Sequence, residues 1–325
     1  MGKGDASLAN VGVKRAKVGV ATQRSLFGEQ DPLGEVSDDG VNGAAASAIL
    51  TASEESIARD PLIRVGTSSF TATGWDKAFY PPGLRQPEWL SYYATKYDTV
   101  EIDSTFYGTP ALTTVQKWAA KTPPGFLFAA KVPQVITHEK VLIDCDAELT
   151  EYLRAMDALG DKLGPLLFQF GHFSERTFRT QADFLAVLQP FLRKLPKGYQ
   201  FAVEIRNKQW LDERFLGMLR DNSVALALID HSWMPRPWET KQQLDWITTD
   251  WTYVRWLGDR KEIEAVTQNQ WNKTVVNRER DLRDWAAVFR QFVGRNLKIY
   301  AYANNHYAGY GPGTIKLFWE VYDKK

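Results

Sequence analysis

The chain has 325 residues, of which 44% are hydrophobic and 24% are charged, a balance typical of a soluble globular protein with a large core. The formal net charge of +1 excludes a global field strong enough to hold nucleic acid without specific contacts. Cys145 is the single cysteine, which excludes an internal disulfide and a thiolate zinc cluster. Because no apolar run approaches a membrane span and no secretory signal is present, we expect a cytoplasmic protein.

Residues 1–60 differ in composition from the rest of the chain. They are rich in Gly, Ala, Ser, Asp and Glu and show no sustained period, which predicts a disordered tail. Within this tail, QRSLF resembles the short peptide by which bacterial DNA repair and replication proteins dock on the sliding clamp. Gln23, Leu26 and Phe27 are the expected anchors, and a chance apolar stretch is the alternative.

Residues 61–325 alternate short apolar or β-branched runs with longer amphipathic segments, which predicts an α/β fold of parallel strands joined by helices. Helical patterns cover residues 87–97, 149–160 and 281–293, whereas the Pro- and Trp-rich segment after Asp230 indicates a long loop. Eight strands, with no G-x-G-x-x-G after the first, favour a single (β/α)8 TIM-type barrel over an open sheet. The expected strands are residues 63–68, 99–103, 126–131, 165–170, 201–206, 224–230, 252–257 and 297–303.

Charged residues interrupt several of these strands. In the second strand Val100 and Ile102 share one face, so Glu101 and Asp103 should point into the barrel from the other. Because isolated buried charges are costly, such residues require pairing or hydration. They form either a functional site, which barrels place at the carboxyl ends of their strands, or an ion-pair network that closes the barrel. The same alternation places further side chains inward: Ser68, Lys131, Gln169, Glu204, Arg206, Asp230 and Arg255.

The region after residue 60 carries a long, ordered run of characteristic stretches. They are GTSSF from Gly66, the segment from Trp75 to FYPPG, TVEIDSTFYGTP from Thr99, GFLFAAKVPQVITHEK from Gly125, KLGPLLFQF from Lys162, AVEIRNKQW from Ala202 and ANN from Ala303. Together they resemble the YecE-like family, known as domain of unknown function 72. The resemblance implies a β/α barrel. The family has no assigned reaction, so the resemblance implies none for this chain. The chain departs from the family at Asp103, often Asn, at Asn207, often His, and at Gly171 and His172, often a Pro pair.

These residue types point to acid/base chemistry on an anion. Glu101 and Glu204 are the expected proton donor and acceptor, because Lys131 and Arg206 would push their pKa values apart. Asp230 is a further catalytic candidate. Guanidinium and ammonium groups suit a phosphate or carboxylate group of the substrate. The expected substrate-binding residues are Ser68, Asp103, Lys131, Gln169, Arg206, Arg255 and Asn304.

A divalent metal site is a weaker alternative, and no cofactor is assigned. No H-E-x-x-H spacing occurs, and the inward cations would repel a metal ion. For His138 and His172, an ordinary loop position is an equal alternative to a role as metal ligands. The side chains that could supply carboxylate or imidazole ligands are Glu101, Asp103, Glu204, Asp230, His231 and His306.

Three functional hypotheses follow. The first is a hydrolase-type enzyme acting on a phosphate-bearing substrate, including phosphodiester hydrolysis in nucleic acid if the clamp-like motif is genuine. The second is a carbohydrate-active barrel, in which two carboxylates cleave and aromatic side chains stack on sugars. The third is a non-catalytic anion-binding protein. The aromatic candidates are Phe70, Trp75, Tyr80, Phe106, Tyr107, Trp210, Trp233 and Trp238.

Overall fold

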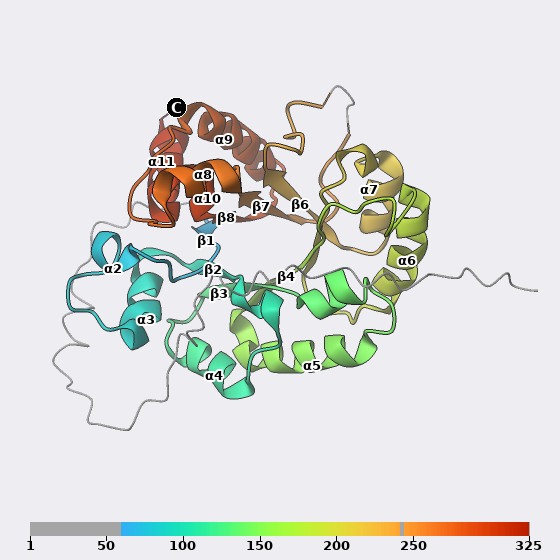
Figure 1. Cartoon of the computed structure of the whole chain (residues 1–325), viewed down its shortest axis with the longest axis horizontal. Helices are drawn as coiled ribbons and strands as arrows, with labels where there is room; N and C mark the ends of the chain where they lie inside the picture. The colour runs from blue at the N-terminus through green and yellow to red at the C-terminus, as the bar shows by residue number, and fades with distance from the viewer. Residues whose placement is uncertain (1–59, 241–243, 325) are drawn as a thin grey trace, which may run out of the picture. The chain divides into compact units, whose positions relative to one another are not determined.

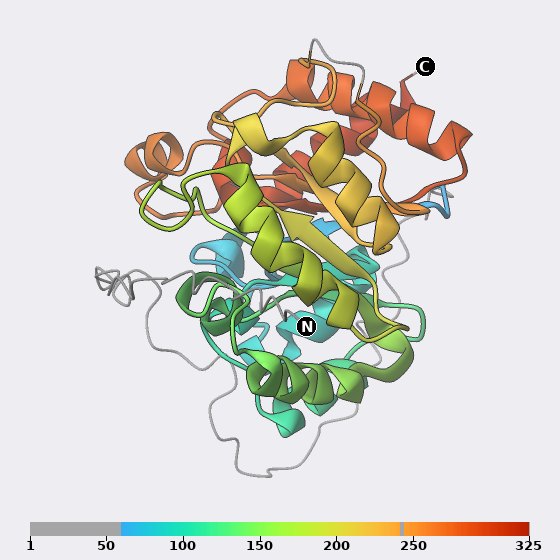
Figure 2. The same ribbon diagram turned by 90° about the vertical axis from the view of Figure 1, so that its right-hand side faces the viewer.

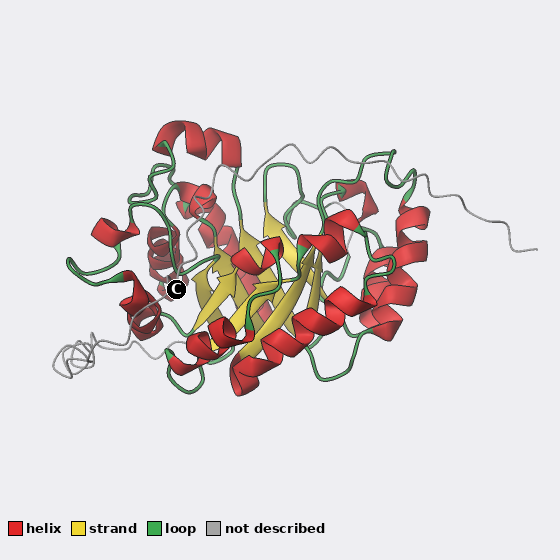
Figure 3. Ribbon diagram, turned by 60° about the horizontal axis from the view of Figure 1, so that its bottom comes forward, coloured by secondary structure: helices red, strands yellow, loops and turns green. Residues whose placement is uncertain are grey.

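The computed structural model describes residues 60–240 and 244–324. Eight strands form a nearly closed parallel barrel with helices around it, which confirms the predicted TIM-type fold (Figure 1, Figure 3). Residues 1–59 and the clamp-like motif within them lie outside the described residues. The strands are β1 (Ile63–Thr67), β2 (Thr99–Ile102), β3 (Leu127–Lys131), β4 (Leu163–Gln169), β5 (Phe201–Glu204), β6 (Ala225–Asp230), β7 (Trp251–Trp256) and β8 (Lys298–Ala303).

Helices return the chain between successive strands, and side-chain caps start several of them. Asp212 and Asp259 accept backbone N–H bonds at the starts of α7 and α8, and Thr180 with Asp183 forms a capping box at α6. Figure 2 shows α6 and α7 lying across the outside of the strands. The helices are α2 (Trp75–Ala78), α3 (Gln86–Lys96), α4 (Leu112–Ala120), α5 (Asp146–Met156), α6 (Gln181–Lys194), α7 (Glu213–Asp221), α8 (Arg260–Thr267), α9 (Glu279–Gly294), α10 (Asn305–Ala308) and α11 (Gly311–Asp323).

The connection between β6 and β7 is a loop, as predicted, since its described residues contain no helix. The sequence also predicted a helix over residues 149–160. The structure begins α5 three residues earlier, at Asp146, and ends it at Met156, where a 3-10 turn (Asp157–Lys162) leads into β4. Among the described helices, none combines the length and the apolar character needed to cross a membrane.

Large aromatic side chains fill the interior of the barrel. Tyr253 on β7 and Tyr302 on β8 lie with ring centroids 5.1 Å apart. Bulky side chains fit there because alanines occupy inner positions of β3, β5 and β6. The outer faces of the strands pack against the helices in a separate, larger cluster that includes Val100 and Ile102. The aromatic layer thus forms a solid floor beneath the carboxyl ends of the strands.

Strands β1 and β2 complete the circle through a close approach, because the hydrogen-bonded strand order runs from β1 through β8 to β2. Gly66 on β1 makes this approach possible. A Cβ atom at Gly66 would lie 2.1 Å from the carbonyl oxygen of Thr99 and 2.8 Å from its carbonyl carbon. Both neighbours are backbone atoms and cannot swing away.

We therefore expect Gly66→Ala to lower the free energy of unfolding by about 1–3 kcal/mol, the usual cost of overpacking. Gly217→Ala is the matched control, because its Cβ would meet nothing within 4 Å and it lies inside α7. The control should raise stability by up to about 1 kcal/mol, as helix propensity dictates. Urea unfolding followed by circular dichroism measures both. Equal stability of Gly66→Ala and wild type would contradict this account of the closure.

Candidate active site

Arg255 on β7 is the central residue of a charged cluster inside the barrel, and its side chain is almost fully buried. It donates to Glu101 Oε1 from Nε at 3.2 Å and from Nη2 at 2.8 Å. It also donates from Nη1 to Glu204 Oε2 at 2.9 Å and from Nη2 to Asp103 Oδ1 at 3.2 Å. One guanidinium group therefore joins acidic side chains that the sequence predicted to point inward from β2 and β5.

Every carboxylate oxygen of the two glutamates is engaged. Tyr253 donates its hydroxyl to Glu101 Oε2 at 2.6 Å, and Arg206 donates from Nε to Glu204 Oε1 at 2.7 Å. Neither glutamate side chain has exposed surface. Such buried carboxylates persist because charged hydrogen bonds offset their desolvation. Tyr253 was not predicted from the sequence as part of the cluster, although it shares the inner face of β7 with Arg255.

The surroundings shift the pKa values of the two glutamates in opposite directions, through burial, Arg255 and Arg206, and not mainly through the expected pair of Lys131 and Arg206. Burial raises the pKa of Glu101, and the nearby charge of Arg255 offsets only part of that effect. Burial would also raise the pKa of Glu204, but Arg206 and Arg255 lower it to about 2. Glu204 is therefore ionised at neutral pH and provides both arginines with a fixed counter-charge.

Three charged side chains of the cluster reach solvent at the mouth of the barrel. The exposed fractions are 31% for Asp103, 12% for Lys131 and 17% for Arg206. Lys131 Nζ lies 3.7 Å from Asp103 Oδ1 and 4.2 Å from the centroid of the Phe106 ring. Burial lowers the pKa of Lys131, and Asp103 counteracts this shift. Incoming molecules would therefore meet one acid and two bases.

Asp230 lies on the outer face of β6, so the prediction that it points into the barrel is wrong. The inner positions of β6 belong to its two alanines. Asp230 Oδ1 accepts from Arg236 Nε at 2.8 Å, and Oδ2 accepts from Trp285 Nε1 and Tyr307 OH, each at 2.8 Å. Trp285 belongs to α9 and Tyr307 to α10. Asp230 therefore anchors the β6–β7 loop and these helices, apart from the cluster around Arg255.

The other predicted binding residues have different surroundings. Gln169 donates from Nε2 to the carbonyl oxygen of Phe170 at 2.7 Å. Asn304 caps α10, accepting from the backbone N–H of His306 at 2.9 Å, so its side chain serves the helix start. Ser68 is buried, and its hydroxyl has no hydrogen-bond partner within the described part of the chain. Of these three, Ser68 is the one whose buried side-chain polar atom has no partner among the described residues.

His138, for which the sequence left an ordinary loop position open, lies beside Lys131 at the mouth. It belongs to a π-helix, Val135–Glu139, and its ring centroid is 5.0 Å from that of Phe106. Its Nδ1 lies 2.8 Å from Thr137 Oγ1. The residue as a whole is exposed, but desolvation of its ring, reinforced by the charge of Lys131, lowers the pKa of His138 to about 4. The sequence signal available was its place in the loop that follows β3.

The candidate metal ligands do not converge. Within residues 60–240 and 244–324, no group of three or more His, Cys, Asp or Glu side chains could hold a metal ion. His306 lies near Asn304 Oδ1 through Nδ1, at 2.6 Å, and near Glu264 Oε1 through Nε2, at 3.1 Å. With Asp230 also engaged elsewhere, the predicted ligand set is divided among separate parts of the structure.

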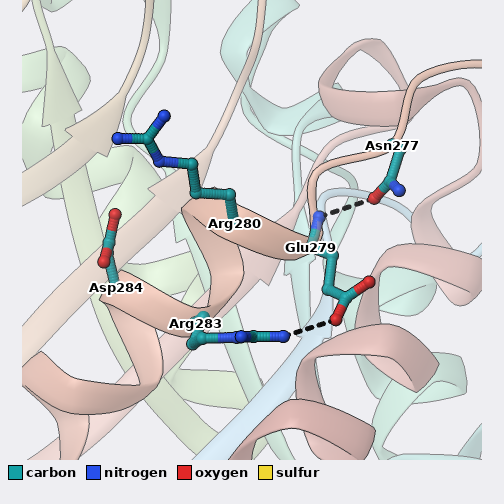
Figure 4. A pocket seen from close by; sticks show the side chains of 5 residues that line it. All are labelled: Asn277, Glu279, Arg280, Arg283 and Asp284. Atoms are coloured by element: carbon teal, nitrogen blue, oxygen red, sulfur yellow. Dashed lines mark hydrogen bonds and ion pairs between the residues drawn. The ribbon is translucent and has the colours of Figure 1, made fainter.

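Two cavities of the described region lie away from the charged cluster, so the cluster is identified by its ion pairs and hydrogen bonds. One, of about 440 Å³, lies at the start of α9 and has Asn277, Glu279, Arg280, Arg283 and Asp284 around it (Figure 4). Its Glu279 and Arg283 pair with each other at 2.6 Å. The other holds only about 10 Å³ between β5, β6 and the β6–β7 loop. Neither includes a residue of the cluster.

A parallel barrel whose strand-end side chains converge in this way defines a TIM-barrel protein with a charged mouth. A family model described as "Protein of unknown function DUF72" matches residues 64–325. The chain therefore belongs to this family, which confirms the resemblance to YecE-like proteins. The family description names no reaction.

Two curated relatives carry family names without a stated activity. UPF0759 protein YecE of Escherichia coli strain K12 is 31% identical over 136 residues, which cover 40% of this chain. The match spans about half of that relative, 48% of its length. UPF0759 protein YunF of Bacillus subtilis strain 168 is 28% identical over 273 residues, covering 77% of this chain and 93% of YunF.

Solved structures show the same fold. A DUF72 family protein from Thermotoga maritima has a TM-score of 0.62 and 23% identity, covering 81% of this chain and 99% of its own. A DUF72 family protein from Enterococcus faecalis has a TM-score of 0.59 and 20% identity, covering 80% of this chain and 95% of its own. At these identities the likeness concerns the barrel architecture alone.

We expect Arg255→Met to lower the free energy of unfolding by about 3–5 kcal/mol, because it leaves buried carboxylates without their counter-charge. The matched control is Arg283→Met, which removes an exposed pair on α9 and should cost less than about 1 kcal/mol. Adding Glu101→Gln to Arg255→Met should recover part of the loss. Urea unfolding measures all three. A loss as small as that of Arg283→Met would contradict the central role of Arg255.

Proposed function

We propose that the protein is a hydrolase-type enzyme that acts on an anionic, phosphate-bearing substrate at the carboxyl ends of the barrel strands. The observation that carries this proposal is the pair of partly exposed cations, Lys131 and Arg206, beside a buried and internally satisfied ion-pair network. Phosphodiester hydrolysis is the reaction that fits these groups best. Active sites of TIM barrels lie at this face.

Lys131 and Arg206 are the proposed anion-binding groups. Arg206 uses Nε and Nη2 on Glu204, and within the described residues its Nη1 has no hydrogen-bond partner. The nearest acid to Lys131 Nζ is Asp103 Oδ1, whose distance of 3.7 Å is longer than a strong hydrogen bond. Each cation thus keeps hydrogen-bonding capacity that a phosphate oxygen can use.

Glu101 and Glu204 are better suited to hold other residues than to touch a substrate. Their oxygens are engaged by Arg255, Tyr253 and Arg206, and their side chains are fully buried. We therefore assign them a positioning role, which replaces the proton transfer expected from the sequence. Glu204 holds Arg206 at the mouth, and both glutamates hold Arg255.

His138 is the group that we assign to proton transfer. With a pKa lowered to about 4, its imidazole is neutral at physiological pH and able to accept a proton. Its Nε2 faces Gly171. A Cβ atom built at this glycine would lie 3.6 Å from Nε2, so the absence of a side chain leaves that side of the nitrogen uncovered. A water activated there would attack phosphorus and pass a proton to His138. The ester P–O bond would break, and the protonated imidazole would return that proton to the departing oxygen.

The backbone around His138 supports a functional role. The histidine lies in a π-helix, a local form common at functional sites. The next residues include three non-glycine positions with positive φ, at Val141 (46°), Leu142 (67°) and Asp144 (51°). Such conformations cost on the order of 1–3 kcal/mol each and persist only where the surrounding structure enforces them. The strained residues that follow the π-helix are therefore consistent with a structure that holds His138 in one place.

Phosphate binding tests the assigned cations. Lys131→Met and Arg206→Lys should each weaken inorganic phosphate at least ~10-fold in calorimetric titration, because each removes charged hydrogen bonds worth about 1.5–3 kcal/mol. Arg206→Lys keeps the charge that Glu204 requires. Asp103→Asn should instead tighten phosphate, since it removes the competing anion. Phosphate affinity unaltered by all three substitutions would refute the proposed site.

Turnover tests the assigned base. On a phosphate ester found by screening, His138→Gln should lower kcat about 100-fold or more, the usual effect of losing a general base. The wild-type rate should fall as pH decreases below about 4, where His138 becomes protonated, and this limb should be absent in the variant. His172→Gln, at an exposed loop histidine, is the control with unchanged rate.

The same measurements separate the two other hypotheses. Tight phosphate binding without turnover of any ester would support a non-catalytic anion-binding protein. Saturable binding of neutral sugars that survives Lys131→Met would support a carbohydrate-active barrel. Either result would replace the proposed reaction.

A further inference from the structure

Two large aromatic side chains are strongly exposed next to the barrel mouth. Trp233, in the loop after β6, is 65% exposed, and Tyr107, in the 3-10 turn after β2, is 58% exposed. Both segments follow the carboxyl ends of strands, where the charged cluster also lies. Large aromatic side chains are usually buried, so exposure of both on this face requires an explanation.

The loop around Trp233 is anchored on both sides of the exposed ring. Met234 is buried against Ile229 and Leu257, and Arg236 forms its ion pair with Asp230. The backbone N–H of Trp233 itself donates to His231 Nδ1 at 3.2 Å. The exposure of Trp233 therefore does not result from a loose loop. A ring held in this way loses little conformational freedom when a ligand stacks on it.

The turn that carries Tyr107 is anchored in a similar way. Thr105 is buried and donates its hydroxyl to the carbonyl oxygens of Ile102 and Lys131, at 2.9 and 2.7 Å. The ring of Tyr107 lies 5.4 Å from that of Phe106. An exposed aromatic ring is thus presented from a fixed backbone on this side of the mouth too.

One exposed ring adjoins an anion-binding cation through an intermediate ring, and the other contacts a histidine that the second cation affects electrostatically. Phe106 lies between Tyr107 and Lys131, whose Nζ is 4.2 Å from its centroid. The ring centroid of His231 lies 5.2 Å from that of Trp233. Burial lowers the pKa of His231, and the nearby charge of Arg206 lowers it further. The mouth therefore combines cations at its centre with flat aromatic faces beside them.

We propose that the substrate is a nucleotide unit, with its phosphate on Lys131 and Arg206 and its base stacked on Trp233. This inference rests on the proposed function and adds the substrate class to it. A nucleotide carries an anion and a flat aromatic ring a few bonds apart, which matches the two kinds of group at the mouth. Stacking of a base on an aromatic side chain is sequence-tolerant and worth about 1–3 kcal/mol.

The test compares four ligands by calorimetric titration of the full chain: adenosine monophosphate, ribose 5-phosphate, adenosine and a short single-stranded oligoadenylate. Adenosine monophosphate should bind at least ~5-fold more tightly than ribose 5-phosphate, as expected for one stacked base. Trp233→Ala should abolish that preference while keeping the affinity for ribose 5-phosphate, and Trp233→Phe should retain most of it. Val266→Ala, at an exposed apolar residue of α8, is the control that leaves all affinities unchanged.

The outcomes distinguish this inference from the proposed function. Equal affinities for adenosine monophosphate and ribose 5-phosphate in wild type would overturn the nucleotide class and leave the phosphate site intact. Failure of every phosphate compound to bind would overturn both. If the class holds, tighter binding of the oligoadenylate than of the mononucleotide identifies a polynucleotide as the source of the unit, and equal binding identifies a free nucleotide.

Discussion

The pairing of Arg255 with Glu101 and Glu204 is the constraint on which the barrel mouth depends. The three side chains come from β7, β2 and β5, none of which are neighbours in the strand order, so the guanidinium group spans the interior. Any one of these charges alone would be costly to bury. The network therefore requires all three strands to keep their register, because a shift of one residue would turn a charged side chain toward the apolar helix layer.

The sequence predicted the barrel and the core of the cluster because two strong physical signals coincide there. Alternation of Val100 and Ile102 with Glu101 leaves only one face for the acid, and the apolar outer positions fix which face that is. Arg255 follows the same rule on β7. Where strand ends carry charges opposite apolar neighbours, local pattern and long-range packing give the same answer.

The errors occur where alternation carries no information about orientation. In β6 every residue before Asp230 is apolar, so both faces look alike, and the choice depends on the need for small side chains inside a barrel filled by tyrosines. The partners of Asp230 lie far along the chain, at Trp285 and Tyr307. For a related reason, the place of His138 beside Lys131 was not predicted. Its position depends on a π-helix, which has no sequence period of its own, and on contacts with Lys131 and Phe106.

The cluster contains equal numbers of acids and bases, and its longest ion pair is the one at the barrel mouth. Three acids, Glu101, Asp103 and Glu204, face three bases, Lys131, Arg206 and Arg255, so the cluster is neutral before any ligand arrives. An anion that reaches a neutral cluster competes with the acids already paired there. The glutamates are fully buried and cannot move without stranding Arg255. Asp103 is the most exposed of the three acids and contacts Lys131 at the longest distance in the network, 3.7 Å. The buried network thus fixes Arg206 and Arg255, whereas Asp103 joins it at the mouth through Arg255 at 3.2 Å and Lys131 at 3.7 Å.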